Sequence, residues 1–228
     1  MAKRKIRLKT RVLSENDREA RKLGRAFDKA RVFVPNLMSS PGAGKTTLLE
    51  ETARRLAGEL RLAAIEGDLA TDRDAARLRR AGIPTHQINT GGGCHLSAWQ
   101  VAEALAHLDL EDLDILFIEN VGNLVCPAEF DLGEHRRVVL ASTPEGDDKP
   151  VKYPIMFHAA DCIVLNKIDL EQAAGFSREA FRGFVRDLRP DVPILEISCR
   201  TGEGFEQWLD WLRAGRQAVR RGQGRIRR

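Results

Sequence analysis

The sequence predicts an α/β fold in which a mostly parallel sheet carries helices on both faces. Two observations lead to this prediction. From about Val32 onward, short β-branched or apolar runs alternate with amphipathic stretches, which is typical of repeated strand–helix units and of parallel strands covered on both sides. The chain also has 228 residues, 43% of them hydrophobic, which suits one buried core better than two.

The alternation places the individual elements. We expect strands near Val32–Ser39, Leu62–Glu66, Thr85–Asn89, Ile115–Asn120, Val138–Ala141, Cys162–Asn166 and Ile194–Ile197. We expect helices near 46–60, 71–81, 97–108, 177–188 and 205–215. The main domain then spans 31–215, with an N-terminal extension over 1–30 and a basic C-terminal tail over 216–228.

The N-terminal extension contains one further expected helix. Ser14, with Asp17 three residues later, is typical of a capped helix start, so we expect the helix to begin there. One face of this helix carries Ala20, Leu23 and Phe27. This apolar face predicts packing against the edge of the sheet.

The charges are mostly interspersed, so no broad surface for nucleic acid is expected. The formal net charge is +4, from 37 basic and 33 acidic residues. The exception is a C-terminal run of arginines without an acidic residue between them, which predicts a solvated, frayed tail. These arginines are Arg213, Arg216, Arg220, Arg221, Arg225, Arg227 and Arg228.

No segment predicts secretion or a membrane span. The N-terminus is basic but lacks an apolar signal region, and no stretch approaches the roughly 18 apolar residues that a span needs. We therefore expect a cytoplasmic protein. Its four cysteines, Cys94, Cys126, Cys162 and Cys199, should stay reduced there, so metal binding or burial explains them better than disulfides.

A glycine-rich turn between a strand and a helix predicts a phosphate-binding P-loop. Gly42 and Gly44 let the backbone N–H groups turn inward onto a β-phosphate, and Lys45 reaches the β/γ oxygens. Thr46 would hold Mg²⁺ through its hydroxyl. The general P-loop pattern has glycine where this chain has Ser39. The predicted nucleotide contacts of this loop are Gly42, Ala43, Gly44, Lys45, Thr46 and Thr47.

A later strand ends in Asn166-Lys167-Ile168-Asp169, which predicts recognition of guanine. The Asp169 carboxylate can accept from both N1–H and N2–H₂ of guanine, whereas adenine lacks these adjacent donors and would leave the charge unpaired. Lys167 can lie over the base through its aliphatic stem, and Asn166 can brace the neighbouring loops. Ser198 and Cys199 follow the last strand and resemble the second base-contacting loop of GTPases, in which backbone N–H groups make the contact.

The strand before Glu119 predicts the second switch of a GTPase. Glu119 would orient a Mg²⁺-bound water, and the N–H of Gly122, three residues later, would meet the γ-phosphate. Asp68, after the second strand, is a further candidate for the Mg²⁺ environment, although an acidic residue at a strand end can equally be a surface or capping group. Lys45, Asp68 and Glu119 are thus the candidate catalytic residues. Since no arginine finger is identifiable, we expect slow hydrolysis.

Two loops carry candidate ligands for a transition metal. Cys94 and His95 follow three glycines just before a helix that starts near Ser97, and Cys126 comes seven residues after Glu119. Each loop follows the carboxyl end of a strand, which favours a shared site, although free cysteines are often simply buried. Three ligands per chain are one fewer than a closed tetrahedral site requires, which indicates a carrier or a site shared between two subunits.

Across residues 14–211 the chain resembles the nickel-inserting GTPases of nickel–iron hydrogenase maturation, the HypB family of SIMIBI-class P-loop proteins. The resemblance rests on six segments: Ser39–Thr47, Ile65–Asp68, Asn89–Leu96, Phe117–Pro127, Glu145–Pro150 and Asn166–Asp169. Ser39 is what this family tends to carry.

The resemblance implies GTP and GDP as ligands and nickel as the metal, with zinc as a competing occupant. It also implies a GTP-dependent homodimer and delivery of nickel to the hydrogenase large subunit precursor together with a small zinc-containing partner. Two alternatives remain: the related urease-type nickel GTPase, and a regulatory GTPase without a metal role. The glycine-rich segment before Cys94 and the segment from Glu119 to Cys126 argue against the urease type.

Overall fold

The computed structural model describes residues 2–68 and 72–224, with side chains from Val12 onward. Its centre is a seven-stranded sheet in the order β3-β2-β4-β1-β5-β6-β7, and all neighbouring strands are parallel. The strands are β1 Pro35–Ser39, β2 Leu62–Asp68, β3 Thr85–Asn89, β4 Ile115–Glu119, β5 Arg136–Ser142, β6 Cys162–Asn166 and β7 Ile194–Glu196. Each overlaps a strand that the sequence predicts.

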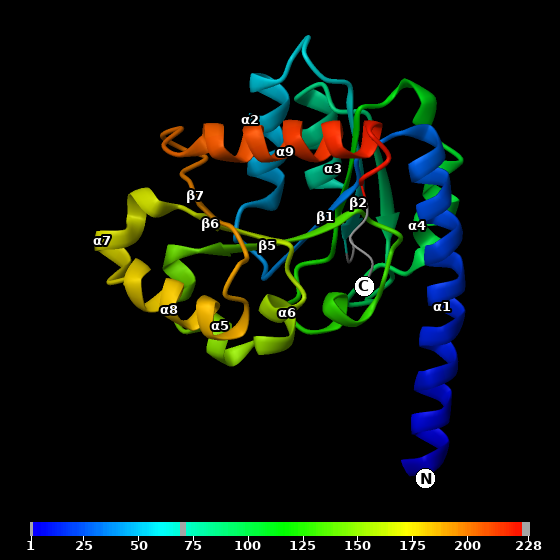
Figure 1. Cartoon of the computed structure of the whole chain (residues 1–228), viewed down its shortest axis with the longest axis horizontal. Helices are drawn as coiled ribbons and strands as arrows, with labels where there is room; N and C mark the ends of the chain where they lie inside the picture. The colour runs from blue at the N-terminus through cyan, green and yellow to red at the C-terminus, as the bar shows by residue number, and fades with distance from the viewer. Residues whose placement is uncertain (1, 69–71, 225–228) are drawn as a thin grey trace.

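Helices cover both faces of the sheet, so the predicted fold class is confirmed (Figure 1). One face is covered by α2 Lys45–Arg55, α3 Arg73–Arg80 and α9 Phe205–Arg220. The other is covered by α1 Ala2–Ala30 and α4 Ala98–Leu105 over one half, and by α6 Pro154–His158 and α8 Arg178–Leu188 over the other half. The short helices α5 Lys149–Lys152, α6 and α7 Glu171–Ala174 were not predicted, because four or five residues are too few to show a helical period.

The inner strands of the sheet are buried on both faces, as their continuous apolar runs require, whereas the edge strands β3 and β7 are partly exposed. Leu37 and Met38 are neighbours in β1, and both are fully buried, yet they belong to the cores on opposite sides of the sheet. The central strand β1 lies between β4 and β5. The loops that leave the carboxyl ends of these strands therefore meet at one edge, where ligands bind in open parallel sheets.

The N-terminal helix differs from the prediction at its start. Helix α1 runs from Ala2 to Ala30, so the expected beginning at Ser14 is wrong. The basic segment before Ser14 contains neither glycine nor proline, and nothing in it interrupts the helix. In Figure 1 this first part of α1 extends beyond the body of the protein. The apolar face is where it was predicted, since Ala20, Leu23 and Phe27 pack in a core with α4.

Part of the predicted frayed tail is helical. Helix α9 continues to Arg220, five residues beyond the expected end at 215. Its arginines are held by ion pairs: Arg213 contacts Glu59, and Arg216 and Arg220 both contact Asp114. These carboxylates come from distant parts of the chain, which local charge patterns do not reveal. Arg225, Arg227 and Arg228 lie outside the described residues.

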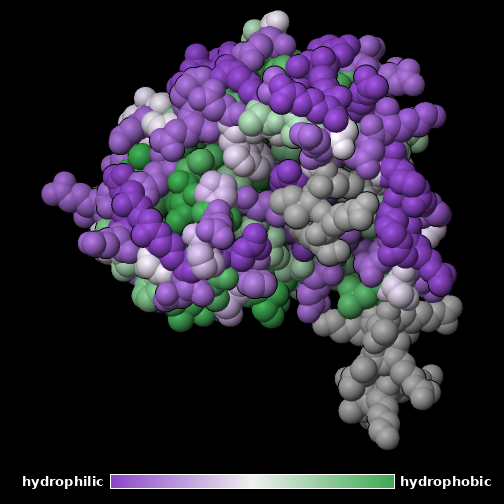
Figure 2. Space-filling view, viewed as in Figure 1, coloured by the Kyte–Doolittle hydropathy of each residue, from purple (hydrophilic) through white to green (hydrophobic). Residues whose placement is uncertain are grey.

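Most of the described surface is hydrophilic in the view of Figure 2, with apolar patches along the lower edge, where α5 and α6 lie. Val151 and Ile155 of this region are 57% and 67% exposed. Within the described ranges, no helix has the length and apolar character that crossing a bilayer requires.

Candidate functional site

A pocket of 390 Å³ opens at the carboxyl edge of the sheet, where the P-loop, the end of β2 and the end of β4 meet. Nine of the predicted site residues line it: Gly42, Gly44, Lys45, Thr46, Thr47, Asp68, Glu119, Gly122 and Lys167. The lining also includes Glu66, Asp74 and Arg77, which the sequence analysis did not single out. Residues from five separate segments thus form one site.

The glycine-rich loop has the backbone shape of a phosphate cradle. Gly42 and Gly44 have φ values of 79° and 103°, which side-chain-bearing residues rarely adopt. A Cβ at Gly44 would also lie 2.6 Å from the side-chain nitrogen of Asn166. Helix α2 begins directly afterwards at Lys45, so its free N–H groups point into the pocket. The turn and the helix terminus together suit an anion.

Two polar contacts prepare the side chains of this loop. Lys45 donates from Nζ to the hydroxyl of Ser39 at 2.9 Å, so the serine in place of the usual glycine holds the lysine. Thr46 donates from Oγ1 to Oε1 of Glu119 at 2.9 Å. Gly122 lies against Pro41, where a Cβ would come within 3.0 Å of the proline ring. The segment after β4 is therefore in contact with the P-loop.

Two buried glutamates, Glu66 and Glu119, line the pocket. Oε2 of Glu66 and Oε2 of Glu119 have no hydrogen-bond partner among the described residues. Burial, and then the charges of Glu119 and Asp68, raise the pKa of Glu66 to about 8. Burial, partly opposed by Lys45 and Thr46, raises the pKa of Glu119 to about 7. Such oxygen donors suit a hard divalent cation such as Mg²⁺.

Glu66 was expected only as the last residue of a strand, whereas β2 continues to Asp68 and Glu66 lies within it. Glu66 pairs in register with Glu119 on the neighbouring strand β4, and both are buried. An acidic residue within an otherwise apolar strand is rare unless it is paired, which is the signal that could have identified it.

Arg77 is the second residue that the sequence analysis missed. Its guanidinium lines the pocket but is engaged by Glu50, Asp74 and the hydroxyl of Thr47. An arginine thus reaches the phosphate end of the pocket, although its donors are directed to protein groups. The sequence offers no motif that would distinguish it from the other arginines of α3.

Beside the pocket, and outside its lining apart from Lys167, the predicted base-recognition residues form one hydrogen-bonded cluster. Asn166 donates to the carbonyl of Ala43 at 3.0 Å and accepts from the N–H of Cys199 at 3.2 Å, so it joins the P-loop to the loop after β7. Asp169 accepts from Ser198 at 2.5 Å and from Arg200 at 2.8 Å. The hydrogen bond from Ser198, followed by the charge of Arg200, lowers the pKa of Asp169.

Lys167 connects this cluster to the phosphate cradle. It has a φ of 61°, in the left-handed region, and its Nζ donates to the carbonyl of Gly42 at 2.7 Å. The hydroxyl of Thr143 donates to the carbonyl of Lys167 and supports that conformation. Lys167 therefore lies between the base-recognition cluster and the P-loop.

The predicted metal ligands are brought together. The ligand atoms of Cys94, His95 and Cys126 all lie within 4.8 Å of one another, and no other such group occurs in the described part of the chain. The sulfur of Cys94 donates to that of Cys126 at 2.7 Å and lies 3.6 Å from Nδ1 of His95. Two thiols and an imidazole suit nickel or zinc.

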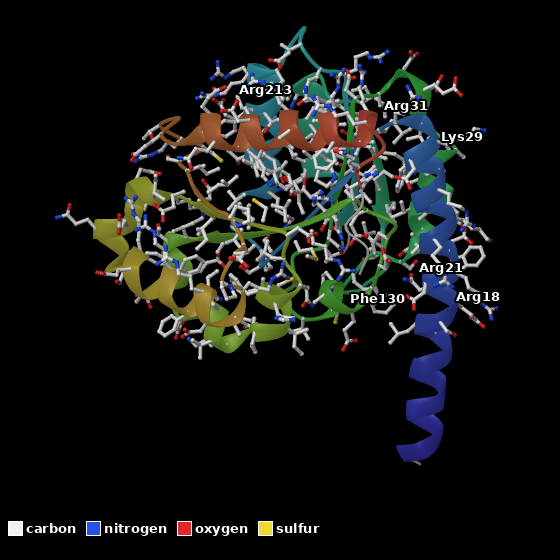
Figure 3. All side chains as sticks on the ribbon, viewed as in Figure 1. Arg18, Arg21, Lys29, Arg31, Phe130 and Arg213 are labelled. Atoms are coloured by element: carbon white, nitrogen blue, oxygen red, sulfur yellow. The ribbon has the colours of Figure 1, made fainter. Side chains whose placement is uncertain are left out.

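The surroundings favour the neutral form of both His95 and Cys126. Burial lowers the pKa of His95, which keeps its imidazole neutral. The hydrogen bond with Cys94, and then burial, raise the pKa of Cys126, so metal binding must displace its proton. The ring of His95 stacks on Phe130 with centroids 3.8 Å apart. Phe130 is labelled in Figure 3 on the side of the molecule that carries α1. The next residue, Asp131, accepts at its backbone carbonyl from the side chain of Asn16 in α1.

A buried arginine supports the loop that carries Cys126. This loop forms the 3₁₀ helix η2 Cys126–Glu129. Arg137 of β5 donates to the carbonyls of Ala128 and Phe130 and pairs with Glu134 at 2.6 Å. The other cysteines stay apart from the cluster: burial raises the pKa of Cys162 in the core and that of Cys199 to about 12.

Comparison with known proteins identifies the family. A model described as CobW/HypB/UreG, nucleotide-binding domain, matches residues 33–196. The hydrogenase maturation factor HypB of Azotobacter vinelandii is 51% identical over 209 residues, which cover 92% of this chain and 69% of that protein.

Solved structures agree. HypB from Helicobacter pylori in complex with nickel has a TM-score of 0.87 and 38% identity, and the match covers 94% of this chain and 99% of that one. HypB from Archaeoglobus fulgidus has a TM-score of 0.83 and 42% identity, covering 89% and 98%. FtsY from Thermotoga maritima, at 18% identity and a TM-score of 0.55, shares the SIMIBI P-loop fold alone. The chain therefore belongs to the CobW/HypB/UreG nucleotide-binding family, among the HypB hydrogenase maturation factors.

Proposed function

We propose that this chain is a GTP-hydrolysing metallochaperone that binds nickel and delivers it during maturation of nickel–iron hydrogenase. The observation that carries the proposal is the Cys94–His95–Cys126 cluster, which is built on loops from the same sheet edge as the phosphate pocket. A nucleotide site and a soft-ligand metal site therefore share the ends of neighbouring strands. The nickel complex of the Helicobacter pylori relative supports nickel as the cargo.

The nucleotide is proposed to be GTP. Its phosphates would lie on the loop from Gly42 to Thr47, with Lys45 reaching the β/γ oxygens. Its base would be recognised by Asp169, whose lowered pKa keeps the carboxylate ionised and ready to accept from guanine.

Mg²⁺ is proposed to lie between Thr46, Glu119 and Asp68, and the free oxygen of Glu66 favours adding that residue to the set. When bound, this cation would neutralise charge that develops on the phosphates. Turnover is proposed to be slow, because the guanidinium of Arg77 is directed to Glu50 and Asp74.

Three metal ligands per chain favour a site that is completed by a second copy of the chain. We propose that the homodimer forms in the GTP state and that the ion exchanges from this open site. The resemblance to the family supports a cytoplasmic role with a small zinc-containing partner and the hydrogenase large subunit precursor as recipient. Zinc is the competing occupant, because the same donors bind it well.

The alternative of a regulatory GTPase without a metal role requires all cysteines to be core residues. Cys162 fits that description, since it is fully buried. Cys94 and Cys126 do not, because both are partly exposed and their sulfurs meet across two loops. The geometry therefore favours the metallochaperone.

Nickel titration of the full chain tests the proposal. Cys94→Ala and Cys126→Ala should each weaken nickel binding by about 10-fold or more, because each removes a thiolate ligand. Cys199→Ala is the matched control, since Cys199 lies outside the cluster, and it should bind nickel like wild type. Equal affinity and stoichiometry in all four proteins would contradict the metal assignment.

The same samples test the shared site. With a non-hydrolysable GTP analogue, Mg²⁺ and nickel, light scattering should report a dimer. A monomer under every condition would contradict completion of the metal site by a second subunit. It would not contradict metal binding by Cys94, His95 and Cys126.

A further inference from the structure

The side chain of Asn120 connects the phosphate pocket to the metal loop. Asn120 directly follows Glu119 at the end of β4 and is 1% exposed. Its Oδ1 accepts from the N–H of Leu96 at 3.1 Å and from the N–H of Val121 at 3.0 Å. Leu96 directly follows the ligands Cys94 and His95. The buried amide of Asn120, the residue after Glu119, thus contacts the backbone of Leu96, the residue after His95.

The chemistry of an amide suits this place. The two N–H donors fix which end of the side chain is the oxygen, and Nδ2 then donates to Oδ1 of Asn36 at 3.3 Å. An aspartate would lose that donation and add a charge next to Glu119, and an apolar residue would leave the N–H groups of Leu96 and Val121 unsatisfied in the interior.

The other side of Leu96 contacts the pocket through β2. Its side chain is fully buried and lies on Gly67, where a Cβ would come within 2.7 Å of the leucine Cδ2. Gly67 stands between Glu66 and Asp68, both of which line the pocket. The beginning of the metal loop is tied to the same place, because the N–H of Thr90 donates to the carbonyl of Asp68 at 3.0 Å.

The metal ligands are connected to the pocket by two different routes. Cys126 is joined to Glu119 along the chain, through the segment that contains Gly122. Cys94 and His95 lie far from Glu119 in sequence and reach it across the Leu96 contacts. If β2 and the end of β4 shift relative to each other when a cation and phosphate arrive, Leu96 must follow, because it is in close contact with both.

We propose that Asn120 and the Leu96–Gly67 contact are the positioning elements that make the metal affinity of the Cys94–His95–Cys126 site depend on the bound nucleotide. This inference rests on the proposed function, since it concerns how the same two sites communicate. Asn120 lines the edge of the pocket, but its side-chain amide is engaged by Leu96, Val121 and Asn36. It sets the distance between the loop of Cys94 and the loop of Cys126.

The coupling factor is the quantity to measure. It is the ratio of the Ni²⁺ dissociation constants of the full chain with GDP and with a non-hydrolysable GTP analogue, both at saturating Mg²⁺. Coupled sites typically give a factor of about 5 to 150, and Ni²⁺ must change the ratio of the dissociation constants of GDP and the GTP analogue by the same factor. This reciprocity distinguishes true coupling from damage to one site.

Two variants break the connection at different points. Asn120→Ala removes the acceptor for Leu96, and Gly67→Ala places a methyl group against the Leu96 side chain. Each should bring the coupling factor close to 1, while Ni²⁺ still binds in the GDP state. Gly183→Ala is the matched control, because a Cβ there meets nothing within 4 Å, and it should keep the wild-type factor.

The outcomes separate the inference from the proposed function. A wild type with a factor of 1 would overturn the nucleotide–metal coupling itself. A coupled wild type together with a folded Asn120→Ala or Gly67→Ala that keeps the full factor would overturn the positioning role alone. If Asn120→Ala fails to fold, Gly67→Ala alone tests the positioning role. Leu96→Ala makes room for the methyl group that Gly67→Ala adds, so the double variant should recover part of the coupling factor.

Discussion

The carboxylates of the proposed nucleotide site differ between its phosphate end, which is the pocket with Glu66 and Glu119, and its base end, which is the cluster around Asp169 beside that pocket. At the base end, Asp169 accepts from Ser198 and Arg200, and these contacts lower its pKa. At the phosphate end, burial raises the pKa of Glu66 and of Glu119, and each keeps an oxygen without a partner among the described residues. Asp169 at the base end is thus stably ionised, whereas ionising Glu66 or Glu119 at the phosphate end costs free energy.

This difference follows from what each end is expected to meet. A carboxylate that accepts from neutral N–H groups must be charged before the ligand arrives, so protein donors keep it ionised. Carboxylates that bind a cation can be partly protonated before it binds, since the cation then supplies the compensating charge. Replacing a carboxylate by an amide should therefore change base selectivity at Asp169 and cation binding at Glu119.

The largest effect is expected at Asp169. Asp169→Asn should reduce the preference for GDP over ADP by about 10²-fold or more, because hydrogen bonds from guanine to a charged acceptor are lost. The variant should gain affinity for xanthosine diphosphate, whose carbonyl can accept from the new amide. Calorimetric titration of the three nucleotides measures this change.

Asp187→Asn, on the exposed side of α8, is the control for the base end and should leave the selectivity unchanged. An Asp169→Asn protein that still prefers GDP as strongly as wild type would show that guanine is selected elsewhere.

A smaller effect is expected at Glu119. Glu119→Gln keeps the size of the side chain and can still accept from Thr46, but it should weaken Mg²⁺ binding to the nucleotide complex by about 10- to 100-fold. Folding stability should not fall at neutral pH, because a buried carboxylate with a raised pKa is costly to ionise. Mg²⁺ titration of a fluorescent GDP complex and thermal unfolding measure both quantities.

For Glu119, the exposed Glu179→Gln on α8 provides the comparison and should behave like wild type. Unchanged Mg²⁺ affinity in Glu119→Gln would remove this residue from the cation environment.

The smallest effect is a dependence on pH. Since the pKa of Glu119 is raised to about 7, its ionised fraction, and with it the Mg²⁺ affinity, should rise about tenfold between pH 6 and pH 8. In the absence of Mg²⁺ the sign for stability is opposite. The folded protein holds protons on Glu66 and Glu119 that the unfolded chain releases above about pH 4.5, so stability should fall as the pH rises toward 8.

Mg²⁺ titrations and thermal unfolding at several pH values measure these trends. Glu119→Gln should flatten the dependence of the Mg²⁺ affinity on pH, and Glu66→Gln should reduce the dependence of stability on pH by removing one of the two groups. A Mg²⁺ affinity that is independent of pH in wild type would mean that these carboxyls are already ionised, and the contrast with Asp169 would disappear.

Prediction from sequence succeeded best where a function is carried by consecutive residues. The P-loop turn at Gly42 and Gly44 and the strand ending in Asn166 were recognised because backbone shape and side-chain chemistry are local there. The grouping of Cys94 and His95 with Cys126 required one further step, namely that parallel strands place their carboxyl ends at one edge.

Other features were decided by contacts between residues that are distant in the sequence. Glu66 gains its character from lying opposite Glu119 across two strands, and Arg77 from the carboxylate of Glu50 on another helix. The misplaced start of α1 had the opposite cause: Ser14 has the local chemistry of a helix start, but the helix continues through it.

The sequence by itself determined the α/β class, the order of the strands along the chain, the guanine and phosphate motifs and the candidate metal ligands. These depend on residue type and on spacing along the chain. Only the tertiary structure decided which side chains share a site: the paired carboxylates of Glu66 and Glu119, and the contact of Leu96 with both Asn120 and Gly67. Such contacts arise from the lateral order of the strands, which packing of the whole sheet selects.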